Sequence, residues 1–199
     1  MPDDATARAV SALVFRPIGP VSVALARDVV ARVSRALAVP CRLDLIAVAA
    51  APALVPGRSQ WDADLLLAAV ENEASLLPSP DDDGAPVGAP VVVALAAHDM
   101  GSPLFTHFFG RSRLRGRAAV VSLARLAPEF YGLAPVSDLT ARRAALEVLH
   151  ELGHVAGLRH CSDSGCIMLL AHHVDAIDVR GTTFCPACAA GLPRGLLRA

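Results

Sequence analysis

The chain has 199 residues with 19 acidic and 18 basic side chains, so its net charge of −1 indicates no general attraction to nucleic acid or to an anionic membrane. All 18 of these basic residues are arginines, which excludes a catalytic lysine. Although 54% of the residues are hydrophobic, no apolar run reaches the roughly 18 residues of a membrane-spanning helix. The length predicts one domain, and the acidic start MPDDATARAV does not have the order of a secretion signal. We therefore expect a cytoplasmic protein with reduced thiols.

Strand-like and helix-like segments alternate along the first half of the chain, and a long helix follows. Strands are expected at 10–15, 41–49, 91–97, 104–110 (as an edge strand) and 118–126. Helices are expected at 21–39, at 60–75 with Ser59 as the cap, and at 138–154. The stretches RPIGP (16–20) and SPDDDGAPVGAP (79–90) have the composition of a turn and a loop. This order of elements predicts an α/β or α+β fold.

Two histidines stand four residues apart in the long predicted helix. His150 and His154 therefore lie one turn apart on the same face, where both imidazoles can reach one ion. Glu151 lies at the flank of that face, and Gly157 suits the left-handed conformation that ends a helix. A chain reversal at the glycine can return His160 as a third ligand, which completes the pattern H-E-x-x-H-x-x-G-x-x-H.

This pattern predicts a zinc site with hydrolytic chemistry. Three histidines leave the fourth tetrahedral position of zinc open to water, and zinc lowers the pKa of that water towards about 7. Glu151 would then take a proton from the water and deliver it to the departing amine, which hydrolyses a peptide bond or another amide. The alternative is a helix whose histidines are simply buried and hydrogen-bonded.

Four of the five cysteines lie near the C-terminal end, as two closely spaced pairs. The pairs are Cys161 with Cys166 and Cys185 with Cys188. Such pairs predict a structural zinc ion held by four thiolates, and two disulfides are the alternative. Cys41 stands alone in a strand-like segment and is expected to be a small core residue.

The histidine and cysteine patterns meet where His160 and Cys161 are adjacent. Seven candidate ligands cannot share one tetrahedral ion. Consecutive side chains of an extended segment point in opposite directions, so these two residues can bind different ions. We therefore expect two zinc ions per chain, one catalytic and one structural, with the structural ion anchoring the loop that carries His160.

The region from His150 to Cys188 resembles the archaemetzincins, a branch of the metzincin metallopeptidases. The shared string is H-E-x-x-H-x-x-G-x-x-H-C-x4-C-x-M, followed after residues 169–184 by C-x-x-C. Weaker similarity covers GRSQWDADLLL (57–67) and FFGRSRLRGRAAVVSLARL (108–126). The resemblance therefore extends over most of the chain, and its specific part is the C-terminal motif.

The resemblance implies an α+β, metzincin-like zincin fold with a twisted mixed sheet and an active-site helix. It implies one catalytic domain, with an N-terminal subdomain at 1–157 and a small C-terminal subdomain at 158–199 that contains the structural zinc. Met168 would lie beneath the catalytic ion as the apolar floor of a Met-turn. A peptide or protein substrate would pair with an edge strand above the cleft, for which 104–110 is the candidate.

Several polar residues lie outside these motifs. The four arginines at alternate positions of Arg111–Arg117 are expected to form a solvated hairpin arm, with an anion contact as the alternative. His172 and His173 follow Met168, and the alternative to a surface role is that one of them lines the cleft. Ordinary surface or hydrogen-bonded roles are expected for His98, His107, His172 and His173. A tyrosine can stabilise a developing oxyanion, but no spacing places Tyr131 at the site.

Three functions compete for this sequence. The first is a zinc peptidase, the second a catalytically weak zinc protein that binds peptides or partner proteins, and the third a zinc-stabilised nucleic-acid module. The balanced charge argues against the third, which also does not explain Glu151. Peptide binding alone needs no base at that position, so Glu151 favours the first. We expect a monomeric peptidase without nucleic-acid or membrane partners.

Overall fold

The computed structural model describes residues 9–50, 53–77 and 88–198. Within these residues, a five-stranded sheet has the strand order β2-β1-β4-β7-β6 and a separate two-stranded sheet pairs β3 with β5. The strands are β1 (Val10–Ile18), β2 (Cys41–Leu43), β3 (Trp61–Asp62), β4 (Ala89–Ala96), β5 (Met100–Gly101), β6 (Gly110–Ser112) and β7 (Ala118–Ser122). The α-helices are α1 (Val23–Ala36), α2 (Ala63–Ser75), α3 (Leu139–Val155), α4 (Val174–Val179) and α5 (Pro186–Ala190).

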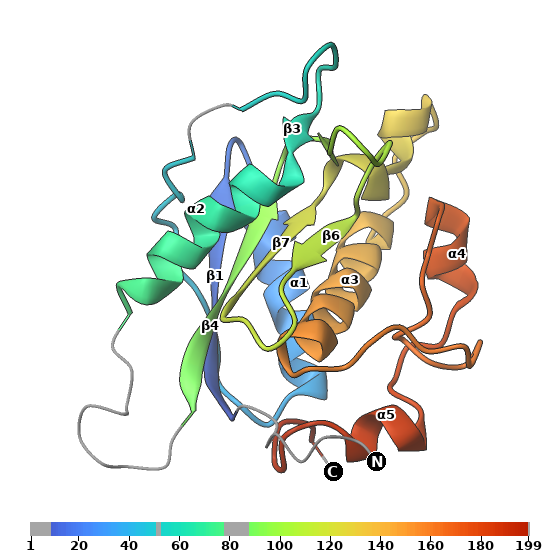
Figure 1. Ribbon diagram of the computed structural model, residues 1–199. Helices are drawn as coiled ribbons and strands as arrows, with labels where there is room; N and C mark the ends of the chain where they lie inside the picture. The colour runs from blue at the N-terminus through green and yellow to red at the C-terminus, as the bar shows by residue number, and fades with distance from the viewer. Residues whose placement is uncertain (1–8, 51–52, 78–87, 199) are drawn as a thin grey trace.

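The large sheet is mixed, because β6 runs antiparallel to β7 while the other neighbouring strands are parallel. Helix α2 covers one face of this sheet, and helices α1 and α3 cover the other (Figure 1). The short helices α4 and α5 lie beyond the C-terminal end of α3 in the chain. The predicted α+β class with a mixed sheet and a long helix is confirmed.

Strand β4 explains why both faces of the sheet are covered. Val91, Val93 and Leu95 pack in the cluster that contains α1 and α3, whereas Val92 and Ala94 pack in the cluster that contains α2. Successive side chains of a strand point to opposite faces, so an unbroken apolar run needs an apolar layer on each side. All five side chains are buried, as expected for the predicted strand 91–97.

The second predicted helix begins later than expected. Its N-cap is Asp62 rather than Ser59, because the Asp62 carboxylate accepts hydrogen bonds from the backbone N–H groups of Asp64 and Leu65 at 2.9 and 3.2 Å. Gln60 precedes the short strand β3 and is not helical. The other two predicted helices are present as α1 and α3, with ends shifted by a few residues.

The predicted strands are present with different ends, apart from the one at 104–110. The first continues through 16–18 to Ile18, the second ends at Leu43, and the last ends at Ser122 and passes into 3-10 turns at Ala124–Leu126 and Pro128–Tyr131. The predicted loop at 79–90 lies largely outside the described residues.

The expectation of an edge strand at 104–110 is wrong. The edge strand is β6, which begins only at Gly110, and the residues before it are irregular apart from one antiparallel bridge between Phe108 and Met100. The physical reason lies in their backbone hydrogen bonds. Ser102 N–H donates to Phe105 O at 3.1 Å, and side chains rather than a neighbouring strand donate to the carbonyls of Phe105 and Thr106.

The hydrophobic core continues past the end of α3. Ile167, Met168, Ile177 and Leu196 are buried in the same cluster as α1 and α3. The division into subdomains at residue 157 stays a prediction. In the part of the chain that the structure describes, no helix has both the length and the apolar character needed to cross a bilayer.

Candidate metal centre and active site

Three histidine side chains converge at the C-terminal half of α3. His150 and His154 come from successive turns of the helix, and His160 comes from the loop that follows it. One ring nitrogen from each residue lies within 4.8 Å of the others. The local spacing brings the first two together, and the turn after the helix brings the third.

The hydrogen bonds of two rings determine which nitrogen faces the centre of the cluster. His150 Nδ1 lies 2.8 Å from Ile167 O, and His154 Nδ1 lies 2.8 Å from Leu158 O. A carbonyl oxygen only accepts, so both Nδ1 atoms carry the proton and donate it. Each neutral ring is then left with a lone pair on Nε2.

The two Nε2 atoms lie 3.2 Å apart. Since both carry lone pairs, this contact is not a hydrogen bond, and the two atoms repel each other unless a cation lies between them. Burial is the main cause that lowers the pKa of His150, to about 3, and it also lowers the pKa values of His154 and His160. Neutral imidazoles are the form that binds a metal, so this set of nitrogen donors fits zinc.

Glu151 is buried beside the histidines, under the edge strand. Ser112 Oγ donates a hydrogen bond of 2.5 Å to Glu151 Oε2. Burial raises the pKa of Glu151 to about 8, and the hydrogen bond from Ser112 opposes that rise. A carboxyl group whose pKa lies near neutral pH is suited to accept and release a proton.

One cavity of about 660 Å³ joins these groups to solvent. Its wall includes the three histidines and Glu151 on one side and β6 on another. The segments 105–109 and 170–172 also line the cavity, as do Leu114, Glu147, Arg159 and Arg180. His107 and His172 both line this cavity, so the alternative that a histidine after Met168 lies at the cleft is correct for His172.

Two residues shape the turn and the floor around the histidines. Gly157 has φ of +104°, in the left-handed region, and its N–H donates to His154 O at 2.9 Å, where the helix ends. Met168 is fully buried against α3, so closely that a Cβ atom on Gly153 would lie 2.4 Å from Met168 Sδ. Met168 thus packs against α3 at Gly153, next in the chain to His154.

Four cysteine sulfurs form a second cluster, one member of which, Cys161, directly follows His160 in the chain. The Sγ atoms of Cys161, Cys166, Cys185 and Cys188 all lie within 4.8 Å of one another. All four cysteines are free, and Cys161 Sγ lies 3.9 Å from Cys185 Sγ, far beyond the S–S bond length of about 2.05 Å. The alternative of two disulfides is therefore wrong.

The sulfurs are surrounded as in a thiolate metal site. Cys185 N–H points at Cys166 Sγ over 3.4 Å, and Asp163 N–H points at Cys161 Sγ over 3.5 Å. Burial and the neighbouring sulfurs raise the pKa of Cys188, because adjacent thiolates repel one another in the absence of a cation. This set of sulfur donors fits a closed, four-coordinate zinc site.

Two charged residues of the centre were missed by sequence reasoning. Arg180 follows α4 and forms a buried ion pair of 2.5 Å with Glu147 of α3, with the two side chains only 1% and 5% exposed. Arg180 also donates to Leu169 O at 3.2 Å. Glu147 stands four residues before Glu151 on a helix, which is a signal for a shared face, but nothing in the local pattern points to Arg180.

The remaining candidates have other roles. The expected solvated hairpin arm is present, since β6 and β7 are antiparallel and Arg113 is 60% exposed. Arg111 and Arg113 also form ion pairs of 2.8 and 2.7 Å with Asp64 and Glu71 of α2. His98 stacks on Trp61, with ring centroids 4.0 Å apart. Tyr131 donates to Arg125 O at 3.1 Å and does not line the cavity. Cys41 is half-buried and packs against the core, as expected.

Comparisons with known proteins agree with this geometry. The profile of peptidase family M54 matches residues 65–194. The chain is 38% identical over 98 residues to the archaemetzincin of Methanocaldococcus jannaschii, which covers 49% of this chain and 55% of that protein. It is also 38% identical over 122 residues to the archaemetzincin of Thermococcus kodakarensis, covering 61% of this chain and 66% of the relative. These matches span between about half and two thirds of the length of the curated relatives.

Solved structures show the same fold. A zinc-dependent peptidase from Methanocorpusculum labreanum superposes with a TM-score of 0.77 at 24% identity, over 90% of this chain and 98% of that one. The archaemetzincin of Archaeoglobus fulgidus, solved in complex with malonate, gives 0.71 at 22% identity, over 91% and 99% of the two chains. These two likenesses establish the fold. The matched profile shows that the chain belongs to peptidase family M54.

Proposed function

We propose that this chain hydrolyses peptide bonds in the cavity beside α3, with His150, His154 and His160 as the ligands of a catalytic zinc and Glu151 as the general base. One observation carries the proposal. The lone pairs of two imidazoles converge within 3.2 Å next to a buried carboxyl group, in a cavity open to solvent. A helix that merely buried its histidines would not direct their unprotonated nitrogens at one another.

Zinc, when bound by these nitrogens, supplies Lewis-acid activation of a water molecule and of the scissile carbonyl. Glu151 accepts the proton of the attacking water on its carboxylate and then delivers it to the departing amide nitrogen. Ser112 holds the carboxyl group in place by its hydrogen bond to Oε2. His150 and His154 are oriented in turn by the carbonyls of Ile167 and Leu158.

The edge strand supplies a binding surface for an extended substrate. Among the described residues, β6 pairs with β7 on one side only, so its other edge offers backbone groups to a peptide. Gly110, Arg111 and Ser112 of this strand all line the cavity. We therefore infer that the substrate is a peptide or protein that adds a strand at this edge.

A second, structural zinc is proposed for Cys161, Cys166, Cys185 and Cys188, which makes two ions per chain. Cys161 follows His160 directly, and its N–H donates to Met168 O at 2.9 Å. An ion held by the four sulfurs would therefore also restrain the loop that carries His160. Reduced thiols, as expected of a cytoplasmic protein, are the form that binds zinc.

A catalytically weak protein of the same fold that binds peptides is the second candidate. Its supporting observation is the same free edge of β6, which serves binding without chemistry equally well. Glu151 separates the two candidates, because binding does not need a buried carboxyl group beside the histidines.

The test combines metal analysis with a cleavage screen on a library of peptides. Wild type, Glu151→Gln and the control Glu129→Gln, an exposed glutamate outside the cavity, should each bind two zinc ions. Only Glu151→Gln should lose cleavage. If wild type binds two ions but cleaves no peptide, the second candidate, a peptide-binding protein, is favoured. If wild type binds one ion and His154→Ala still binds it, the histidines hold no zinc and the peptidase proposal is contradicted.

A further inference from the structure

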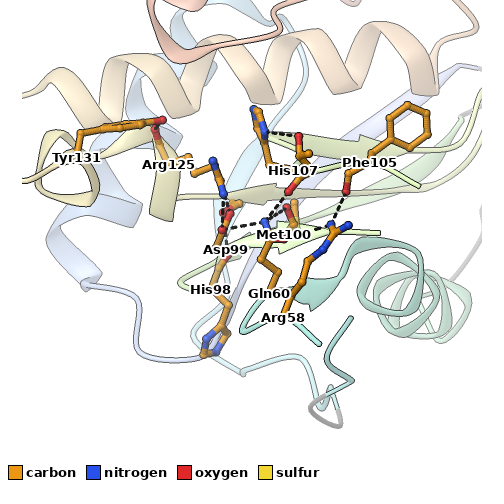
Figure 2. A network of polar contacts seen from close by, with 11 residues as sticks. Arg58, Gln60, His98, Asp99, Met100, Phe105, His107, Arg125 and Tyr131 are labelled. Carbon is orange, nitrogen blue, oxygen red and sulfur yellow. Dashed lines mark hydrogen bonds and ion pairs between the residues drawn. The ribbon is translucent and has the colours of Figure 1, made fainter. Parts of the chain in front are cut away.

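One wall of the cavity is formed by residues 105–109, which belong to a segment without regular secondary structure at 102–109. Phe105, His107 and Phe108 of this segment line the cavity next to β6. An irregular backbone keeps one shape only if its polar groups find partners. Here the carbonyls of Ser102, Phe105 and Thr106 accept hydrogen bonds from side chains outside the segment. Figure 2 shows these side chains converging on the segment from one side, while the rings of Phe105 and His107 lie on the other.

Gln60 is the buried centre of this support. Its side-chain nitrogen donates to Thr106 O at 2.7 Å and to Asp99 Oδ2 at 3.0 Å. Gln60 also packs closely against Gly101. A Cβ atom on Gly101 would lie only 2.9 Å from Gln60 Oε1. Arg125 holds Asp99 through two hydrogen bonds of 2.7 and 2.9 Å, so the acceptor of Gln60 is itself held in place.

Arg58 adds a second clamp at the tip of the segment. One guanidinium nitrogen donates to both Ser102 O and Phe105 O, each at 3.0 Å. Phe105 N–H in turn donates to Ser102 Oγ at 3.1 Å. The backbone on both sides of Phe105 is therefore restrained, although the residue lies on the surface.

The side chains that this support presents are aromatic and accessible. Phe105 is 59% exposed, and its ring lies 5.4 Å from that of Phe108, which lies below the guanidinium of Arg111 at 5.2 Å. Phe109 leads directly into β6 at Gly110, so the rings continue the edge at which a peptide would pair. An exposed ring next to a half-buried one, both at the wall of a cavity, suits a bulky apolar side chain of a ligand.

We propose that Phe105–Phe109 form a preorganised subsite for a bulky apolar side chain of the substrate, with Phe105 and Phe108 in contact with it and with Arg58 and Gln60 as positioning residues. This inference rests on the proposed function, since it assigns part of the substrate to that cavity. Preorganisation raises affinity because the wall loses no freedom when the ligand binds.

The test uses two small ligands that share a zinc-binding group. Acetohydroxamate and 3-phenylpropanohydroxamate differ by one benzyl group, and calorimetric titration of the zinc-loaded protein gives the ratio of their affinities. In wild type the benzyl group should tighten binding roughly 10- to 100-fold, as expected for burial of an aromatic side chain. Phe105→Ala and Arg58→Ala should each reduce this ratio at least about threefold and leave the affinity for acetohydroxamate unchanged.

The matched control is Leu104→Ala. Leu104 precedes Phe105, is 89% exposed and does not line the cavity, so both affinities should stay as in wild type. A wild-type ratio near one, or a ratio that survives Phe105→Ala, overturns the subsite. Loss of acetohydroxamate binding by zinc-loaded wild type would instead contradict the proposed catalytic zinc and the inference with it.

Amide hydrogen exchange tests separately whether Arg58 and Gln60 position the segment. In Arg58→Ala and Gln60→Leu, the amides of residues 102–109 should exchange at least about tenfold faster, while those of α3 keep their wild-type rates. Protection of α3 also shows that the variants are folded. Unchanged exchange in the segment would contradict the role of Arg58 and Gln60, whatever the outcome of the titrations.

Discussion

Gly110 of the edge strand and Glu151 of α3 are in direct contact. A Cβ atom on residue 110 would lie 2.4 Å from Glu151 Oε1 and 2.7 Å from its Cγ. Glycine therefore lets the strand lie directly on the carboxyl group, with Ser112 bonded to the other oxygen two residues further along. The strand that would bind the substrate and the base that would act on it are held at a fixed separation.

Gly110→Ala should accordingly reduce activity without removing zinc. The added methyl group displaces either β6 or the Glu151 carboxyl group, and misplacement of a reacting group by about 1 Å lowers the rate roughly 100-fold. Steady-state kinetics and metal analysis check this. The control Gly165→Ala, whose Cβ would first meet an exposed carboxylate oxygen at 3.3 Å, should keep wild-type activity.

The contact between Gly110 and Glu151 also shows where sequence reasoning stopped. The clusters of His150, His154 and His160 and of the four C-terminal cysteines depend on short spacings, so their members could be predicted from local geometry. Gly110 and Ser112 meet Glu151 only because β6, β7 and α3 pack together, and no local pattern encodes that packing.

The errors in secondary structure have similar causes. The aromatic segment 104–110 has the composition of a strand, yet its backbone is held by Gln60 and Arg58 from far away in the chain. Ser59 and Asp62 are both good helix caps, and the pairing of Trp61 with Met100 selects the second by keeping Trp61–Asp62 extended. Arg180 was missed because it follows α4, whereas its partner Glu147 lies 33 residues earlier in α3, so no local pattern links the two.

Ser112→Ala should make activity more sensitive to acid. The hydrogen bond from Ser112 lowers the pKa of Glu151, so its removal raises that pKa further. The base acts only when deprotonated, and activity is lost as the pH falls through its pKa. The acidic limb of kcat/KM should therefore move to higher pH, with a loss of roughly 10-fold at pH 6 and little change at pH 9.

The control for this profile is Ser75→Ala, an exposed serine at the end of α2. Its profile should coincide with that of wild type. An unchanged acidic limb in Ser112→Ala would show that Ser112 does not act on the base in the zinc-loaded enzyme.

The buried pair of Arg180 and Glu147 should behave as a unit in stability measurements. Arg180→Met leaves the Glu147 carboxylate buried without its partner and should lower the free energy of unfolding by about 3–5 kcal/mol. The double variant Arg180→Met/Glu147→Leu removes both charges and should lie within about 1 kcal/mol of wild type. Urea unfolding of the zinc-loaded proteins measures both.

An exposed ion pair provides the comparison. Arg142→Met breaks a pair with Asp178 in which the arginine side chain is 51% exposed, and it should change the free energy of unfolding by less than about 1 kcal/mol. Equal losses in the single and double variants of the buried pair would mean that packing, rather than the unpaired charge, sets their stability.

Cys188→Ser should remove the structural zinc and weaken the histidine site as well. Cys161 binds the proposed structural ion and is adjacent to His160, so loss of that ion frees the loop that carries the third histidine. Metal analysis should give one zinc or fewer per chain, and the Tm should fall by at least about 10 °C, because metal binding contributes directly to folding. Cys41→Ser, which changes the free cysteine of β2, should retain both ions. Retention of two ions by Cys188→Ser would mean that three sulfurs suffice and that the closed four-thiolate site is not what anchors the loop.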